Sequence, residues 1–283
     1  MPTFTNQATL LYNTGVVNSN IVTGEILRVL SATKTVLDDG YRTGAPVTYV
    51  ISIVNTGSTP YTNLTVTDDL GAYEFNGTTL YPLDYNGTVN YYANGILQPT
   101  PTVTAGPPLV ISGINVPANG NALIVYQATP NSFAPLTNDS TITNTATING
   151  SGLSAPITAT ATLPSAAGTQ LAITKTLTPA SVAENGTLTY TFLIENLGST
   201  PATAEDNLSV TDTFDPILSN IAVTLNGVTL TTPESYSYSE ATGVFTTVPG
   251  VITVPAATYV QDPDTGVWTT VPGTATLTIS GTV

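Results

Sequence analysis

The chain contains only two lysines, and both lie in nearly the same five-residue context. Lys34 lies in SATKT and Lys175 in AITKT, and each is followed by a similar apolar segment, VTYVISIVNTGSTP or LTYTFLIENLGSTP. Further along, Asp68 in LTVTDDL corresponds to Asp212 in LSVTDTF. A chain so poor in lysine that places both at equivalent positions of a repeat is expected to use them for a specific purpose.

An asparagine also recurs in this repeat, but its second copy lies at the N-terminus of the chain rather than after the second repeat. After its first copy the repeat continues into ITNTATINGSGLSAPITATATL, which contains Asn144 and predicts two strands joined by a loop, whereas the second copy stops at Val283. The N-terminal FTNQATL matches ITNTATI and aligns Asn6 with Asn144, and IVTGEIL matches ITATATL. The N-terminal segment is therefore a copy of the hairpin that the second repeat lacks.

The composition predicts an all-β fold, because Val, Ile and Thr are abundant and 23 Gly and 21 Pro interrupt the chain at short intervals. We expect two tandem Ig-like β-sandwiches, domain 1 (residues 28–164) and domain 2 (residues 165–283), the second without its final strands. Residues 1–27 would be donor strands. Tight hairpin turns are predicted at Asn94-Gly95 and Asn226-Gly227, and a further hairpin around DPDTG in an insertion in domain 2.

The repeat blocks resemble the Ig-like "conserved repeat" domains of bacterial surface proteins, and the lysine, acid and asparagine resemble those of Gram-positive pilins and adhesins that form Lys–Asn isopeptide bonds. The resemblance implies an intramolecular bond between Lys34 and Asn144. It equally implies an intermolecular bond between Lys175 and Asn6. Asp68 and Asp212 would be the respective proton shuttles.

The choice of acid left two other candidates in domain 1. Many isopeptide domains use Glu, and Glu74 lies near Asp68, but domain 2 has no counterpart of Glu74. Asp69 has Thr213 as its counterpart, which argues against it as well.

The chemistry explains these residue types. Burial disfavours the ammonium form of lysine, so a buried lysine can attack as a neutral amine. Asparagine offers an amide carbonyl and ammonia as leaving group, and a buried aspartic acid can polarise the carbonyl and move protons. The reaction is a single turnover, so the chain is not expected to be an enzyme. Alternatively, the lysines protect strand edges and the Asp and Asn residues form turns.

The N-terminal strands are expected to complete the next subunit rather than their own chain. About seven residues separate Leu27 from Lys34 and span roughly 25 Å, whereas a domain of this size is roughly 35 Å across. Donation to a neighbour is β-strand addition, and a head-to-tail contact of this kind gives an open fibre. We therefore expect a structural subunit of a self-assembling, pilus-like surface filament. The alternative is an adhesin or S-layer-like stalk that binds a ligand through its loops.

Charge and composition exclude several other classes. The net charge is −14 with four basic residues, so neither nucleic acid nor an anionic membrane is an expected partner. Without His or Cys a zinc site is not expected, and Asp38-Asp39 and Asp262/Asp264 lack the ligand density of a calcium loop. We expect no cofactor, no membrane span and no signal peptide in this numbering. The expected location is extracellular, on a bacterial cell or spore.

Overall fold

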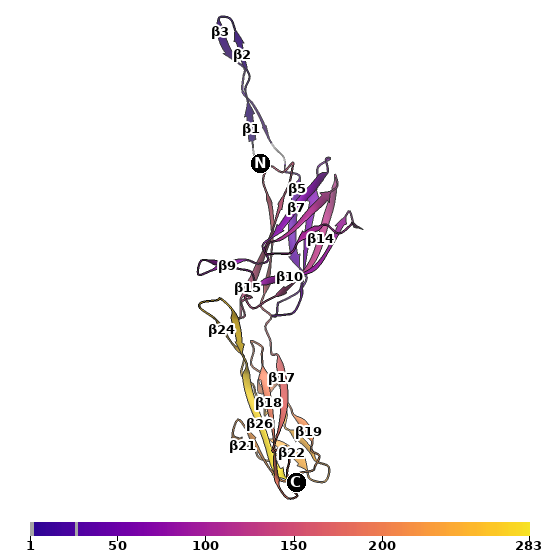
Figure 1. Cartoon of the computed structure of the whole chain (residues 1–283), viewed down its shortest axis with the longest axis vertical. Helices are drawn as coiled ribbons and strands as arrows, with labels where there is room; N and C mark the ends of the chain where they lie inside the picture. The colour runs from indigo at the N-terminus through magenta and orange to yellow at the C-terminus, as the bar shows by residue number, and fades with distance from the viewer. Residues whose placement is uncertain (1–2, 26–27) are drawn as a thin grey trace. The chain divides into compact units, whose positions relative to one another are not determined.

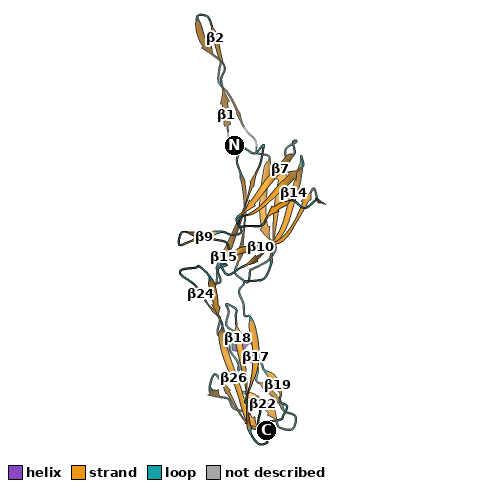
Figure 2. Ribbon diagram, in the orientation of Figure 1, coloured by secondary structure: helices purple, strands orange, loops and turns teal. Residues whose placement is uncertain are grey.

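The computed structural model describes residues 3–25 and 28–283 of the chain, and nearly all its regular structure is β-strand. Figure 2 shows strands joined by turns and loops, and the one helical element among the described residues is the short 3-10 turn η1 (Ala204–Asp206). The expected all-β fold class is confirmed. The chain divides into two compact units, residues 1–134 with 141–164 and residues 135–140 with 165–283, which we describe separately.

Domain 1 is a sandwich of two five-stranded antiparallel sheets, with strand orders β11-β10-β14-β6-β5 and β12-β13-β7-β15-β16. Figure 1 labels β5, β10 and β14 of the first sheet and β7 and β15 of the second. A small ribbon of β8 and β9 extends from it. The strands are β5 (Leu30–Val36), β6 (Val47–Asn55), β7 (Tyr61–Asp68), β8 (Tyr73–Phe75), β9 (Thr78–Leu80), β10 (Leu83–Ala93), β11 (Ile96–Leu97), β12 (Thr102–Thr104), β13 (Leu109–Val116), β14 (Gly120–Pro130), β15 (Thr141–Asn149) and β16 (Ile157–Pro164).

Alternating side chains build the core of this sandwich. In β6 every second residue from Val47 to Ile53 is buried, and β14 shows the same period. From the facing sheet Leu64, Ile111 and Ile148 are fully buried against them. Successive strand residues point to opposite faces, so this alternation decides which side chains face the core.

The hairpin β15–β16 closes one side of domain 1. Its β15 extends the ladder of β7 over residues 146–149, and its β16 lies beside β5 of the opposite sheet. Inward-facing Asn144 and Ala146 are fully buried, whereas outward-facing Thr143 and Thr145 contact threonines across the hairpin. The hairpin thus buries one apolar face and exposes a threonine-rich one.

Domain 2 repeats the first sheet of domain 1 but only part of the second. Its sheet β17-β18-β26-β20-β21 matches β5-β6-β14-β10-β11, and its three-stranded sheet β19-β23-β22 matches β7-β13-β12. Among residues 165–283 no strand takes the places of β15 and β16. The strands are β17 (Leu171–Thr178), β18 (Thr187–Asn196), β19 (Thr211–Thr213), β20 (Ser219–Leu225), β21 (Val228–Thr229), β22 (Tyr236–Ser239), β23 (Val244–Thr247), β24 (Thr258–Gln261), β25 (Trp268–Val271) and β26 (Gly273–Thr282).

The predicted turns are confirmed. Asn94 and Gly95 have φ of 48° and 77°, and Asn226 and Gly227 have φ of 51° and 78°, as a type I′ hairpin turn requires. The insertion in domain 2 forms the hairpin β24–β25, in which Gln261 pairs with Trp268 around the DPDTG turn.

The N-terminal segment forms a hairpin of two short ribbons, β1 (Thr3–Asn6) with β4 (Val22–Glu25) and β2 (Thr9–Tyr12) with β3 (Gly15–Asn18). Its large apolar side chains are unusually open to solvent, with more than half of the surface exposed in each. They are Phe4, Leu10, Leu11, Tyr12, Val16, Val17, Ile21 and Val22. Exposed apolar residues in such number are typical of a surface that binds another protein.

The register of this hairpin differs from the one that the repeat predicts. The match of IVTGEIL with ITATATL places Glu25 at the position of Ala161, which is opposite Asn144 in domain 1. The structure instead pairs Asn6 with Val22 and Thr3 with Glu25, a shift of three residues. In the observed register, Val22 is the cross-strand neighbour of Asn6, and Glu25 lies on the opposite face of the hairpin. Burial of the face that carries Asn6 would therefore not bury the Glu25 carboxylate without a partner, which would be costly.

No helix in the described part of the chain is long and apolar enough to cross a membrane.

Candidate functional site

Three strands bring the predicted residues of domain 1 together. Lys34 faces inward from β5, Asp68 ends β7, and Asn144 lies on β15. The Lys34 Nζ is 2.6 Å from the Asp68 Oδ2, and neither side chain has any exposed surface. Lys34 is buried because it occupies an inward position of its strand, between the partly buried Ala32 and Val36. The core thus brings together the lysine and the aspartate that the repeat singled out.

The surroundings favour the reactive form of the lysine. Burial lowers the pKa of Lys34, and the neighbouring Asp68 opposes this only in part. The Nζ lies 5.0 Å from the centre of the Tyr49 ring and 5.9 Å from that of Tyr126. Aromatic rings and the Asp68 carboxylate thus replace water around the amine, and this burial favours the neutral form of Lys34.

The Asn144 carboxamide is hydrogen-bonded to Tyr126 and lies beside Tyr49. Its Nδ2 donates to the Tyr126 hydroxyl at 3.1 Å, and that hydroxyl donates to the Asp68 Oδ2 at 2.6 Å. The Asn144 Oδ1 is buried without a hydrogen-bond partner. The sequence analysis missed Tyr126. Its one signal was an aromatic residue with a hydroxyl at an inward position of β14, opposite Tyr49.

The two rejected acids have other roles. Glu74 lies on the ribbon β8–β9, where it accepts a hydrogen bond from Thr79. The Asp69 Oδ1 accepts from the backbone N–H of Thr145 at 2.8 Å and of Gly71 at 2.9 Å. Asp69 therefore anchors β15 beside Asn144, although it does not contact the lysine.

In domain 2 the corresponding lysine and aspartate also form an ion pair, but both side chains are partly exposed to solvent. The Lys175 Nζ donates to the Asp212 Oδ2, and these side chains are 39% and 19% exposed. Rings of Tyr190, Phe192 and Phe214 lie around the amine, with Tyr190 nearest at 4.4 Å. The site has the amine, the acid and an aromatic wall. Within the described residues, no asparagine bonds to either member of this pair.

The uncovered face beside Lys175 is apolar. Every residue of β17 is exposed, including Leu171 and Ile173, whereas β5 of domain 1 has Leu30 buried at the position of Leu171. A groove runs along β17, and its lining also includes side chains from β18 and from the segment before β19. The lining residues are Leu171, Ala172, Ile173, Ile194, Leu208, Ser209, Val210 and Ile252.

The opposite wall of the groove is an open strand edge. In domain 1, β7 spans eight residues and pairs with both β13 and β15. In domain 2, β19 spans three residues and pairs with β23 alone. A free edge of this kind accepts a further strand. Domain 2 thus lacks in the described structure what β15 and β16 provide in domain 1, namely a strand on β19, a cover over β17 and an asparagine.

Asn6 is the residue that the repeat assigns to the vacant asparagine position. It ends β1, and opposite it lies Val22, as Ala161 lies opposite Asn144. Phe4 and Asn6 alternate along β1 as Ile142 and Asn144 do along β15. The spacing of apolar residue and asparagine is therefore the same in both hairpins.

Other candidate sites have ordinary structural roles. The Asp38 Oδ2 accepts from the backbone N–H of Thr48. The backbone N–H groups of Thr265 and Asp264 lower the pKa of Asp262. No group of three or more metal-ligating side chains occurs among the described residues.

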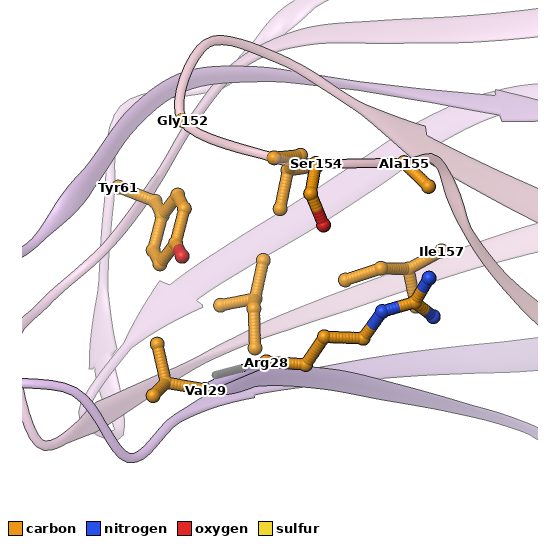
Figure 3. A pocket seen from close by; sticks show the side chains of 9 residues that line it. Arg28, Val29, Tyr61, Gly152, Ser154, Ala155 and Ile157 are labelled. Atoms are coloured by element: carbon orange, nitrogen blue, oxygen red, sulfur yellow. The ribbon is translucent and has the colours of Figure 1, made fainter. Parts of the chain in front are cut away.

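A hollow at one end of domain 1 lies under the loop between β15 and β16, and Figure 3 shows Arg28, Tyr61 and Ser154 facing it. It contains none of the lysine, aspartate or asparagine residues discussed above.

Comparisons with solved structures give matches of low identity. The major pilin subunit of Bacillus cereus is 12% identical, with a TM-score of 0.39, over 94% of this chain and 70% of that one. The pilus backbone RrgB of Streptococcus pneumoniae is 12% identical, with a TM-score of 0.34, over 86% of this chain and 55% of that one. The major pilin SpaD of Corynebacterium diphtheriae is 12% identical, with a TM-score of 0.36, over 86% and 59%.

No family model matches the chain, and no curated protein matches it. These three structures are pilins, other matched structures are enzymes or an adhesin domain, and matches with TM-scores this low identify no function. The functional argument therefore depends on the geometry of the chain itself.

Proposed function

We propose that the chain is the structural subunit of an extracellular filament on a bacterial cell or spore surface. Subunits assemble head to tail, with the N-terminal hairpin of one subunit completing domain 2 of the next. Lys–Asn isopeptide bonds lock the assembly. The observation that carries the proposal is the complementary pair within one chain, an incomplete sandwich with an open lysine site and a free hairpin with the matching asparagine.

The hairpin suits the groove in shape and chemistry. One strand would add to the free edge of β19 by backbone hydrogen bonds, as β15 does on β7, and the other would cover β17, as β16 covers β5. Apolar side chains such as Phe4 and Leu10 would fill the place of the buried Ile142 and Ile148. Burial of one such side chain contributes about 1.5–3 kcal/mol. Several of them would hold subunits together before any bond forms.

The contact is heterologous, since the hairpin and the groove are different surfaces. A pair of joined subunits therefore still has one unused hairpin and one unused groove, and such a contact continues as an open fibre unless the rotation closes a ring.

Covalent locking would follow from the burial that docking causes. The hairpin would exclude water from Lys175 and place Asn6 opposite it, so that the site comes to match that of domain 1. Transfer of an ammonium proton to Asp212 gives a neutral amine, which attacks the Asn6 carbonyl carbon. The C–N bond to the amide nitrogen breaks, ammonia leaves, and one Lys–Asn amide joins the two subunits. In domain 1, Lys34 and Asn144 form the same bond within one chain.

A mixing experiment with two half-competent chains tests the assembly. A chain without residues 1–27 can only accept, and a Lys175→Ala chain can donate but cannot accept covalently. Each alone should run as a monomer in hot SDS, and their mixture should give one covalent heterodimer and no ladder. An Asn6→Ala, Lys175→Ala double variant is the matched control and should give no heterodimer with the acceptor. A mixture that stays monomeric would refute the covalent donor-strand link.

A further inference from the structure

Tyr126 lies at the centre of the domain 1 site, although neither the lysine nor the asparagine pattern predicts it. It is 1% exposed, and its ring stacks on that of Tyr49 with the centroids 5.5 Å apart. Its hydroxyl contacts Asp68 and Asn144 at once, donating to the former and accepting from the latter. These two contacts connect the acid directly to the nitrogen that must leave.

The same carboxylate oxygen of Asp68 contacts both the lysine and the tyrosine. One oxygen, Oδ2, contacts both the Lys34 Nζ and the Tyr126 hydroxyl, each at 2.6 Å. The other oxygen, Oδ1, accepts from the backbone N–H of Leu70 at 3.1 Å. A proton that leaves Lys34 therefore arrives on the oxygen that Tyr126 touches. On its far side the Tyr126 hydroxyl meets the Asn144 Nδ2.

We propose that Tyr126 is a catalytic proton relay for the Lys34–Asn144 bond, an inference that rests on the function proposed above. Asp68 takes one proton from the Lys34 ammonium, and the neutral amine forms a bond to the Asn144 Cγ. The protonated Asp68 then gives its proton to the Tyr126 oxygen while the Tyr126 O–H passes its own proton to Nδ2. The Cγ–Nδ2 bond breaks, and ammonia leaves. Asp68 takes the second proton from the new amide nitrogen, which keeps one, and can pass it to the ammonia.

The surroundings keep Tyr126 in the form that such a relay needs. Burial raises the pKa of Tyr126 well above its usual value, and the charge of Asp68 raises it further. The hydroxyl therefore stays protonated and can donate and accept in the same step.

Domain 2 lacks this relay. In domain 1, Tyr126 pairs with Tyr49, and the residue that pairs with Tyr190 in domain 2 is Ile279. The ring stack itself is kept, because Phe214 stacks on Tyr190 at 4.9 Å. Phe214 occupies the repeat position of Leu70 and has no hydroxyl. Domain 2 thus keeps stacked aromatic rings beside the lysine but has no hydroxyl at the position of Tyr126. The Lys175–Asn6 bond should therefore form more slowly than the Lys34–Asn144 bond.

The test measures the rate of ammonia loss as chain that was produced and kept in denaturant, and so has not yet formed the bond, folds for the first time. The full chain carries Asn6→Ala, so that domain 1 is the one source of mass loss, and samples are quenched in acid and weighed by intact-mass spectrometry. Tyr126→Phe keeps the ring but removes both hydrogen bonds, and it should slow ammonia loss by about 100-fold. Circular dichroism should show folding at the parent rate. Tyr49→Phe is the matched control, since the Tyr49 hydroxyl lies beside Asn144 but makes no hydrogen bond to Asp68, and it should react at nearly the parent rate.

A second measurement separates a relay from packing. Incorporation of 3,5-difluorotyrosine at position 126 makes the hydroxyl more acidic with little change in shape, and it should alter the rate several-fold at unchanged melting temperature. Ammonia loss from Tyr126→Phe at the parent rate, or equal slowing by both Phe variants, would overturn the relay. If the parent itself lost no ammonia, the proposed bond would be absent, and that result is distinct from a failure of the relay alone.

Discussion

Domains 1 and 2 carry a lysine and an aspartate at equivalent positions of equivalent strands, but the two sites differ in how far they are buried. In domain 1, Lys34 and Asp68 are fully buried beneath β15 and β16, with Asn144 beside them. In domain 2, Lys175 and Asp212 retain exposed surface on an open groove. The same residue types therefore occur in one enclosed site and in one open site. Enclosure lowers the pKa of Lys34 and places Asn144 at the site of domain 1. Under the proposed assembly, a neighbouring subunit would enclose Lys175 and bring Asn6 to it.

The largest expected effect comes from removing the donor. Deletion of residues 1–27 should abolish fibres in negative-stain micrographs, because each domain 2 would then keep an open groove with nothing to fill it. Domain 1 should stay folded, since its own β15–β16 hairpin completes it. Circular dichroism checks this, and fibres from the truncated chain would show that another surface drives assembly.

The next effect contrasts the two aspartates. In an Asn144→Ala background, which forms no bond in domain 1, Asp68→Ala should destabilise that domain by about 3–5 kcal/mol, because it leaves Lys34 buried without a counter-charge. Asp212→Ala should change the stability of domain 2 by less than about 1 kcal/mol, because solvent already screens that pair. Denaturant unfolding of the monomers measures both. Equal losses would mean that the two sites are not differently enclosed.

The bond itself should contribute to the stability of domain 1. A link between residues 34 and 144 closes a long loop and, by analogy with disulfides, should stabilise by about 4–5 kcal/mol. Asn144→Ala should therefore lower the melting temperature of domain 1 by roughly 15 °C. An Asn149→Ala change on the exposed end of β15 serves as control. A melting temperature unchanged by Asn144→Ala would argue against a cross-link.

The smallest effect is a dependence on pH. In the unbonded Asn144→Ala chain the pKa of Lys34 lies below its usual value of 10.5. Between the lowered and the usual pKa the unfolded state binds more protons, so the stability of domain 1 should rise with pH through that window. Lys34→Met should remove this rise. A stability that falls with pH through that window in the unbonded chain would contradict a lowered pKa of Lys34.

The sequence predicted much of this arrangement because the repeat carries it. The alternating strands, the Asn-Gly turns and the lysine–aspartate pairs follow from local pattern. Two features did not. The register of the N-terminal hairpin depends on which face Val22 and Glu25 take, and a short alternating segment allows more than one pairing. Tyr126 joins the site through a strand far from the lysine, the aspartate and the asparagine motifs, so only the folded sandwich reveals its contacts.

The most direct test of the account is the mass of the smallest covalent oligomer of the wild-type chain. Fibres are boiled in SDS, the dimer band is isolated, and its intact mass is measured. We predict two chains minus three ammonia molecules, one for each domain 1 and one for the Lys175–Asn6 junction, and an Asn6→Ala preparation should give monomers that have each lost one. A wild-type sample that runs wholly as monomer, or a dimer whose junction peptide lacks Lys175 or Asn6, would contradict the account.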